Sequence, residues 1–256
     1  MPLRELLARW VVPSRAPCSL ADLSDVAATT DALREVEAAF LLIPPLFDPA
    51  PGFPEIRSLV AGLRTAIFEA CPGRLVCLST IGAQATQPNL LVQLGLVEEA
   101  LSDLPLPVAF LRAAWFMENF AGDEAGARSG KISSFLQPLG KPFPMVATAD
   151  IGRLAASMLQ EHWTGHRVVE LEGPTRVTPN EVATAFGKVL ARPVEAEALP
   201  RDTWEALFQS QGMQNPTPRA QMLDGFNEGW LELQGKALKG ETLIESVLAS
   251  LIHRGS

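Results

Sequence analysis

Two hydroxyl residues stand where an α/β protein commonly places its chemistry. Ser79 and Thr80 come at the end of an apolar run at 75–79, and ligands of open parallel sheets gather at the carboxyl ends of the strands. A hydroxyl there can bond a carboxamide or a substrate carbonyl, and it can equally cap the following segment. The sequence leaves both roles open.

A second group of candidates follows the apolar run at 107–111. Ala114, Trp115 and Phe116 come just after it, and the two aromatic rings would form a flat apolar wall for a ring-shaped substrate. Core packing competes with that role and is favoured for Phe116. Asn119 is the better candidate for a polar contact.

Other kinds of site find little support. His162 and His166 are four residues apart, but residues 163–165 read as a turn, so no metal site is predicted. The pair Glu98 and Glu99 is most simply a solvated helix face. No Gly-x-Ser-x-Gly turn occurs, so hydrolase chemistry is not indicated.

Composition narrows the classes of partner. Hydrophobic residues make up 47% and charged residues 20%, which is typical of a globular domain, and the formal net charge is −8 with scattered basic residues. These features argue against nucleic acid. No apolar run approaches the roughly 20 residues that a membrane span needs, so we expect a cytoplasmic protein with a small-molecule ligand. Cys18, Cys71 and Cys77 form no CxxC pair, and burial is the ordinary fate of Cys77.

The elements that position these residues alternate between strands and helices. Apolar runs at 38–43, 75–79 and 107–111 predict strands buried on both faces, and helical spacing at 53–71 and 90–101 predicts the crossovers between them. Such alternation gives a right-handed parallel sheet.

The second half of the sequence predicts one more strand and then mostly helices. We expect a strand at 167–171, a helix at 151–160 capped by residues 148–150, and a helix at 182–190 opened by residues 178–181. After Pro193 the pattern is mostly helical. We therefore expect a Rossmann-like domain over residues 1–175 and a small, mostly helical substrate lobe over 176–256.

Several segments carry a resemblance to one family. They are Ala-Asp-Leu-Ser-Asp at 21–25, Phe-Leu-Leu-Ile-Pro-Pro at 40–45, Leu-Ser-Thr-Ile-Gly-Ala at 78–83, Phe-Leu-Arg-Ala-Ala-Trp-Phe-Met-Glu-Asn at 110–119, and Val-Ala-Thr-Ala-Asp-Ile at 146–151. Together they resemble the NmrA-like branch of the atypical short-chain dehydrogenases/reductases. The resemblance implies an α/β, doubly wound Rossmann-like fold that binds NADP or NAD. Some members look like quinone or azo-dye reductases, and others sense the cofactor without turning it over.

The resemblance also implies places for individual residues. Asp22 and Leu23 would flank the adenine, and Pro44 and Pro45 would lie along the cofactor edge, where stopping the strand is an equally good explanation. Arg15 would stand near the 2′-phosphate of NADP, although an ordinary surface arginine is the favoured interpretation. Ser79 and Thr80 fall at the nicotinamide end. Asp25 is more simply a helix cap.

The family pattern fails at the start of the sequence. No glycine precedes Gly52 and no two glycines are three residues apart, so the glycine-rich turn that receives a pyrophosphate is absent. We expect the first strand to be missing as well, because the start codon was assigned too late or because the chain is a degenerate paralogue. Cofactor affinity would be poor, and open strand edges would invite self-association, for example as a homodimer.

Catalytic residues of the superfamily are also missing. Its usual chemistry needs a tyrosine and a nearby lysine, but this sequence has no tyrosine and no lysine before Lys131. The reaction that remains is direct hydride transfer to a quinone-like or other small conjugated acceptor. This reaction depends more on the proximity of cofactor and acceptor than on a strong acid. The alternative is a non-catalytic regulator that responds to NAD(P) or to a partner protein.

Overall fold

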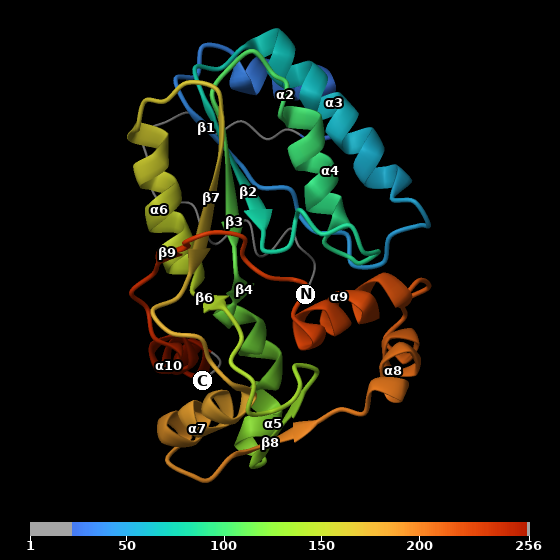
Figure 1. Cartoon of the computed structure of the whole chain (residues 1–256), viewed down its shortest axis with the longest axis vertical. Coiled ribbons are helices and arrows are strands. Elements are labelled where there is room, and N and C mark those ends of the chain that lie inside the picture. Colours follow the sequence, from blue (N-terminus) through green and yellow to red (C-terminus); the bar gives the residue numbers. More distant parts are fainter. Residues whose placement is uncertain (1–21, 255–256) are drawn as a thin grey trace.

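A parallel sheet of five strands forms the centre of the structure, a computed structural model that describes residues 22–254. The strand order is β1-β2-β3-β7-β9 (Figure 1). The strands are β1 (Ala39–Leu41), β2 (Leu75–Thr80), β3 (Val108–Ala113), β7 (His166–Glu172) and β9 (Leu238–Lys239). All four predicted strand runs are confirmed.

Helices cover both faces of this sheet, as expected of a doubly wound α/β fold (Figure 1). On one face lie α3 (Pro54–Ala70) and α4 (Val92–Leu101), with α2 (Val26–Leu33) packed on α3. On the other lies α6 (Thr148–Gln160). Because successive strand residues point to opposite faces, Cys77 and Phe110 pack under α3 and α4, whereas Val76 and Leu111 pack under α6.

Two helix starts have the caps that the sequence predicted, and a third does not. Asp25 caps α2 by accepting the N–H of Ala28, and Thr178 forms a capping box with Glu181 at α7 (Pro179–Leu190). The expected cap at residues 148–150 is wrong. Instead α6 begins at Thr148, and the carboxylate of Glu118 accepts its N–H and hydroxyl from a neighbouring segment.

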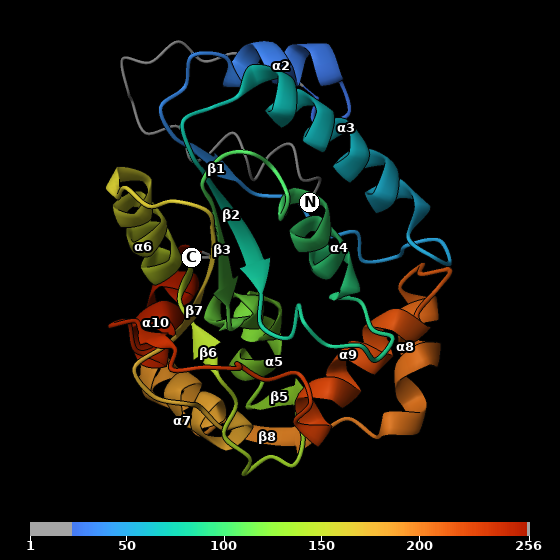
Figure 2. The same ribbon diagram turned by 45° about the horizontal axis from the view of Figure 1, so that its top comes forward.

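A second layer of elements lies beyond the carboxyl ends of the strands (Figures 1 and 2). Strand β3 continues almost directly into β4 (Trp115–Phe116), which pairs with β6 (Met145–Val146). Strand β5 (Lys131–Ser134) pairs with β8 (Glu195–Ala198). The helices of this layer are η1 (Met117–Asp123), α5 (Glu124–Arg128), η2 (Arg201–Thr203), α8 (Trp204–Ser210), α9 (Thr217–Glu228) and α10 (Ile244–Arg254). The division into domains at residue 175 stays a prediction.

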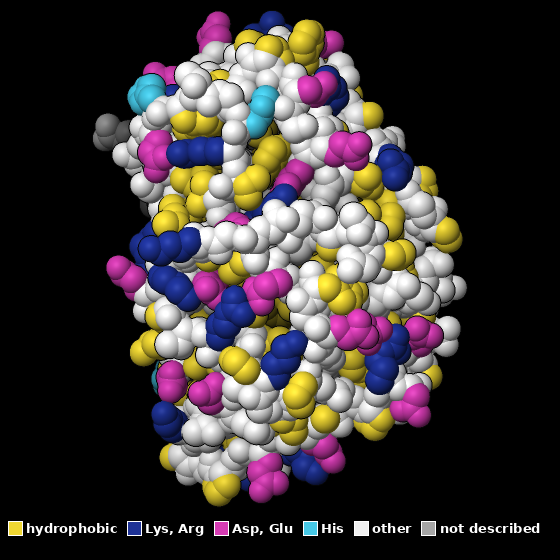
Figure 3. All heavy atoms as spheres, in the orientation of Figure 1, with side chains coloured by type: hydrophobic (Ala, Val, Ile, Leu, Met, Phe, Trp, Pro, Cys, Tyr) yellow, Lys and Arg dark blue, Asp and Glu magenta, His cyan; other side chains and the backbone are white. Residues whose placement is uncertain are grey.

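The outer surface is mixed in character. Basic and acidic side chains are interspersed over the face shown in Figure 3. On β1, which is an edge strand within the described part of the chain, Phe40 is 40% exposed, and Leu42 just beyond it is 46% exposed. None of the helices in residues 22–254 is both long and apolar enough to pass through a bilayer. Arg15 and Cys18 lie outside the described residues.

Candidate functional site

A cavity of about 620 Å³ opens at the carboxyl ends of β1, β2 and β3. The sheet side of its wall includes Ile43, Pro45, Thr80, Ile81 and Ala114. The opposite side comes from η1, from β5 and the two residues after it, from Gln211 after α8, and from α9. It includes Asn119, Phe120, Asp123, Phe135, Arg219 and Phe226. Concave, mainly apolar sites with a few polar groups are typical binding sites for small molecules.

Most of the residues that the sequence singled out for the sheet edge line this cavity. They are Pro45, Ser79, Thr80, Ala114, Trp115, Phe116 and Asn119. Pro44 is not among the lining residues. Asp22 and Leu23 lie before α2, where Asp22 accepts hydrogen bonds from Ser24 and Leu23 packs on the core under α3. Their place beside an adenine stays a prediction.

The two hydroxyls at the end of β2 have different surroundings. Ser79 is buried, and its hydroxyl donates to Glu98 on α4 at 2.5 Å. Thr80 points to the other face of the sheet, and its hydroxyl makes no side-chain hydrogen bond within residues 22–254. Thr80 is therefore the hydroxyl that remains available to a ligand.

Glu98 belongs to a buried network, so its interpretation as a solvated helix face is wrong. The guanidinium of Arg112 donates to both carboxylate oxygens of Glu98, at 2.9 and 2.7 Å, and the two side chains are only 8% and 12% exposed. Arg112 also donates to the amide oxygens of Gln84 and Gln234. Hydrogen bonding to Glu98 is the largest effect that raises the pKa of Arg112. The network ties α4 and the chain before β9 to the sheet beside the cavity.

Aromatic rings form much of the cavity wall. Trp115 meets Phe226 edge to face with ring centroids 5.2 Å apart, and Phe135 packs against Phe208 at 5.3 Å. The indole N–H of Trp115 is buried and has no hydrogen-bond partner in the described residues. Such a wall suits a planar, conjugated ligand.

Two ionisable side chains line the cavity, and the sequence predicted neither. Burial raises the pKa of Asp123 from 3.8 to about 6, and burial lowers the pKa of Arg219. The two side chains form no ion pair with each other. Asp123 follows the predicted 110–119 segment by only a few residues, but nothing in its local sequence marks it as buried.

The cavity fits one part of a nicotinamide cofactor. The small side chain of Ala114 and the unpartnered hydroxyl of Thr80 leave room and a polar contact for a nicotinamide ring at the strand ends. The described strand ends carry no glycine-rich turn for a pyrophosphate. At the one tight turn after β2, Gly82 has φ +74°, and a Cβ there would meet the backbone of Leu231 at 3.3 Å, so this glycine serves packing.

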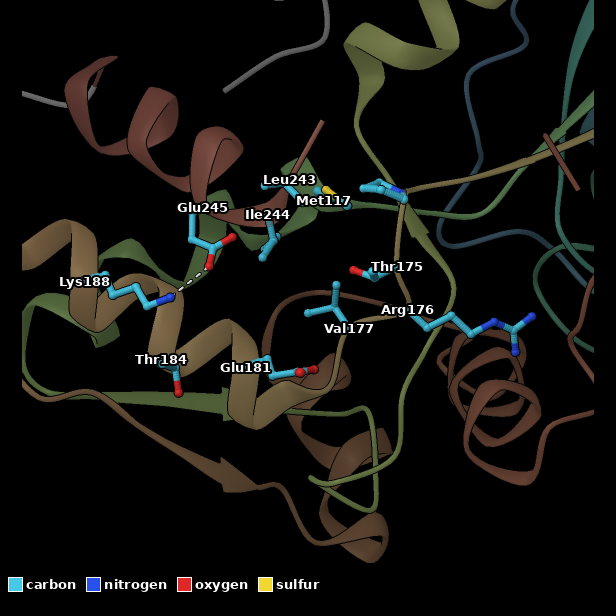
Figure 4. Close-up of a pocket in the computed structure, with 11 residues that line it drawn as sticks. Met117, Thr175, Arg176, Val177, Glu181, Thr184, Lys188, Leu243, Ile244 and Glu245 are labelled. Carbon is cyan, nitrogen blue, oxygen red and sulfur yellow. Dashed lines mark hydrogen bonds and ion pairs between the residues drawn. The ribbon is translucent and has the colours of Figure 1, made fainter. Parts of the chain in front are cut away.

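A second, smaller cavity of about 310 Å³ lies between α7, α10 and the chain after β7 (Figure 4). Its charged residues are already paired. Lys188 binds Glu245 at 3.1 Å, Glu181 is used in the capping box, and Arg176 points away from the cavity to bind Glu232 (Figure 4). We therefore regard the larger cavity as the functional site.

Three further reactive residues are held in structural environments. Burial, with a smaller effect of the Glu98 charge, raises the pKa of Cys77 to about 12, so its thiol is inert. His166 contacts the carbonyl of Leu104, and Lys141 donates to the carbonyls that end α9. Within residues 22–254 no three His, Cys, Asp or Glu side chains come together as a metal site.

Comparison with known proteins places the chain in a family. The model of the NmrA-like family matches residues 93–239, which is more than half of the sequence. The chain belongs to the NmrA-like family. The match includes β4, η1 and α9, which all contribute residues to the cavity wall.

Two curated relatives carry the names of redox enzymes. The chain is 26% identical to an agroclavine dehydrogenase of Claviceps fusiformis over 75% of this chain and 64% of that protein. It is 28% identical to the (4-alkanoyl-5-oxo-2,5-dihydrofuran-3-yl)methyl phosphate reductase of Streptomyces griseus over 68% of this chain and 59% of that protein. The chain thus spans about three fifths of the length of these relatives.

The fold is shared with solved structures of other proteins. An NADPH-dependent quinone oxidoreductase of Escherichia coli, in complex with NADPH, superposes with a TM-score of 0.73 at 22% identity, over 90% of this chain and 82% of that chain. At this identity the likeness establishes the fold only. The predicted Rossmann-like α/β architecture is confirmed.

Proposed function

We propose that this NmrA-like chain is an NAD(P)H-dependent reductase whose larger cavity holds a small conjugated acceptor, such as a quinone, beside the nicotinamide. One observation carries the proposal: an aromatic cavity of about 620 Å³ opens at the strand ends where open α/β folds bind their ligands. The redox names of the two relatives and of the solved quinone oxidoreductase support it. NADP(H) rather than NAD(H) is proposed as the preferred cofactor.

The side chains of the cavity divide the work of binding. A reduced nicotinamide, when bound, would supply a hydride, that is two electrons and one proton, to an acceptor. Trp115 and Phe226 form one apolar wall against a planar acceptor, while the hydroxyl of Thr80 and the exposed amide of Asn119 bind its oxygens. The lobe of residues 176–256 closes the acceptor side.

Asp123 is the proton-holding group of this proposal. With no tyrosine in the chain, a half-buried carboxyl whose pKa is raised to about 6 is the group in the cavity wall that can hold a proton near neutral pH. It can release that proton to an acceptor oxygen and recover one from water.

A titration tests the proposal directly. Purified protein is titrated with NADPH and NADH, followed by nucleotide fluorescence and thermal shift, and then assayed for reduction of menadione. We expect binding and turnover, with the stronger binding for NADPH. Nucleotide binding without turnover would favour the alternative, a non-catalytic regulator. If neither nucleotide binds, the proposed reductase activity is wrong.

A further inference from the structure

Arg219 on α9 places a positive charge in the wall of the apolar cavity. Its guanidinium lies over the ring of Phe208, 4.3 Å from the centroid, and 6.0 Å from the centroid of Phe47. Stacking on aromatic faces holds the guanidinium plane and leaves the N–H groups at its edge for other partners. The cation is thus positioned in advance of any ligand.

No oxygen of the described protein binds this guanidinium. It donates a hydrogen bond to the sulfur of Met213 at 3.6 Å. Every other arginine whose side chain the structure describes donates to a carboxylate or a carbonyl; these bonds involve Arg34, Arg57, Arg64, Arg74, Arg112, Arg128, Arg153, Arg167, Arg176, Arg192 and Arg201. Arg219 is the exception, and it is also the one that lines the cavity.

Acidic residues on neighbouring segments are already in use. Asp48 accepts the backbone N–H groups of Gln214 and Asn215, at 2.8 and 2.7 Å, just before α9. Asp224, on α9 itself, binds Arg201 at 2.6 Å. A half-buried guanidinium without a counter-charge is unfavourable, and an anion entering the cavity would relieve that cost.

We propose that this cavity selects acceptors that carry an anionic oxygen group, a carboxylate or a phosphate, which Arg219 binds. The inference rests on the proposed function, because it concerns the acceptor that the same cavity is proposed to bind. Arg219 binds the anionic group at the α9 side, and the planar part of the molecule lies against the aromatic wall that leads to Trp115. Asp123 lies in the η1 part of the wall and does not pair with Arg219.

Binding of matched probes tests this without any cofactor. Titration calorimetry compares 2-naphthoate, 2-naphthyl phosphate and the neutral 2-naphthamide, which share one ring system. We expect at least one anion to bind about tenfold or more tightly than the amide, as a hydrogen-bonded charge pair that is partly shielded from water would give. The naphthoate and phosphate arms tell which anionic group is preferred.

Two variants assign the preference to Arg219. In Arg219→Gln the anion should lose its advantage over the amide, and Arg219→Lys, which keeps the charge but not the planar fork, should retain part of it. The control Arg57→Gln removes an exposed arginine of α3 that lies outside the cavity wall, and it should bind all three probes as the wild type does. Thermal melting confirms that each variant is folded.

The outcomes separate this inference from the reductase proposal. If menadione is reduced but the anions bind no better than the amide, or no probe binds at all, the anion site is wrong and the reductase stands. A second outcome is that the anions bind more tightly than the amide and Arg219→Gln removes this preference, while NADPH neither binds nor reacts. That outcome would support the anion site and contradict the reductase proposal. An anion preference that survives in Arg219→Gln would overturn the role of this residue.

Discussion

Glu98 on α4 and Arg112 on β3 form a two-pronged ion pair, with N–O distances of 2.7 and 2.9 Å, beneath the carboxyl edge of the sheet. The pair also receives the hydroxyl of Ser79, which stands opposite Arg112 in the register of β2 and β3. One ion pair therefore fixes the helix, two strands and a predicted site residue together. This explains why Ser79 is unavailable to a ligand although it borders the cavity.

Breaking this pair should cost much of the stability of the domain. In Glu98→Gln the buried guanidinium of Arg112 loses its counter-charge, and we expect the free energy of unfolding to fall by about 3 kcal/mol or more. Urea denaturation measures it. The control Glu197→Gln breaks an exposed pair with Lys131 and should change the value by less than about 1 kcal/mol. Equal losses in the two variants would show that burial does not make this pair important.

The sequence predicted the fold and one half of the site for the same physical reason. Buried parallel strands are continuous apolar runs, and the residues that end them must meet at one edge of the sheet, so Thr80, Ala114 and Trp115 could be found without coordinates. Asn119 was found because it follows Trp115 by only a few residues. Asp123 and Arg219 could not, because their burial depends on how η1 and α9 close over that edge.

Glu98 gives a second example of a side chain whose burial could not be predicted from the sequence. Two adjacent glutamates on a helix read as solvated, but only Glu99 is exposed, while Glu98 turns toward Arg112. Which of two neighbours faces the sheet is set by the rotation of α4 about its axis, and a helix with apolar residues on several sides does not reveal that rotation.

Asp150 on α6 should hold the segment before α10 onto that helix. Its buried carboxylate accepts the N–H groups of Glu241 and Thr242 and the hydroxyl of Thr242, at 3.1, 3.0 and 2.8 Å. In Asp150→Ala these donors lose their acceptor, so we expect the free energy of unfolding to fall by about 2–4 kcal/mol. Limited proteolysis should cut earlier before α10. The exposed neighbour variant Glu241→Ala should behave as the wild type, and unchanged proteolysis in Asp150→Ala would contradict the assignment.

Trp115 should report directly on occupancy of the cavity. Its indole lines the cavity, whereas Trp163 stacks against Arg167 at 4.3 Å elsewhere on the surface. A bound quinone quenches a neighbouring indole, so menadione should lower tryptophan fluorescence in the wild type and in Trp163→Phe. The quenching should be largely lost in Trp115→Phe. Quenching that persists in Trp115→Phe would place the quinone outside this cavity.

Asp123 should make both stability and turnover depend on pH. Its pKa in the folded protein, about 6, is above the ordinary value of 3.8, so the folded state favours the protonated carboxyl, and stability is lost as pH rises between these values. Asp123→Asn should therefore match the wild type below about pH 4 and exceed its free energy of unfolding by on the order of 2 kcal/mol above about pH 6. The exposed Asp202→Asn should show no such pH-dependent gain.

As the proposed proton source, Asp123 should also make menadione reduction fall above about pH 6, and Asp123→Asn should be slower with a flat profile. A declining profile that persists in Asp123→Asn would assign the proton to another group.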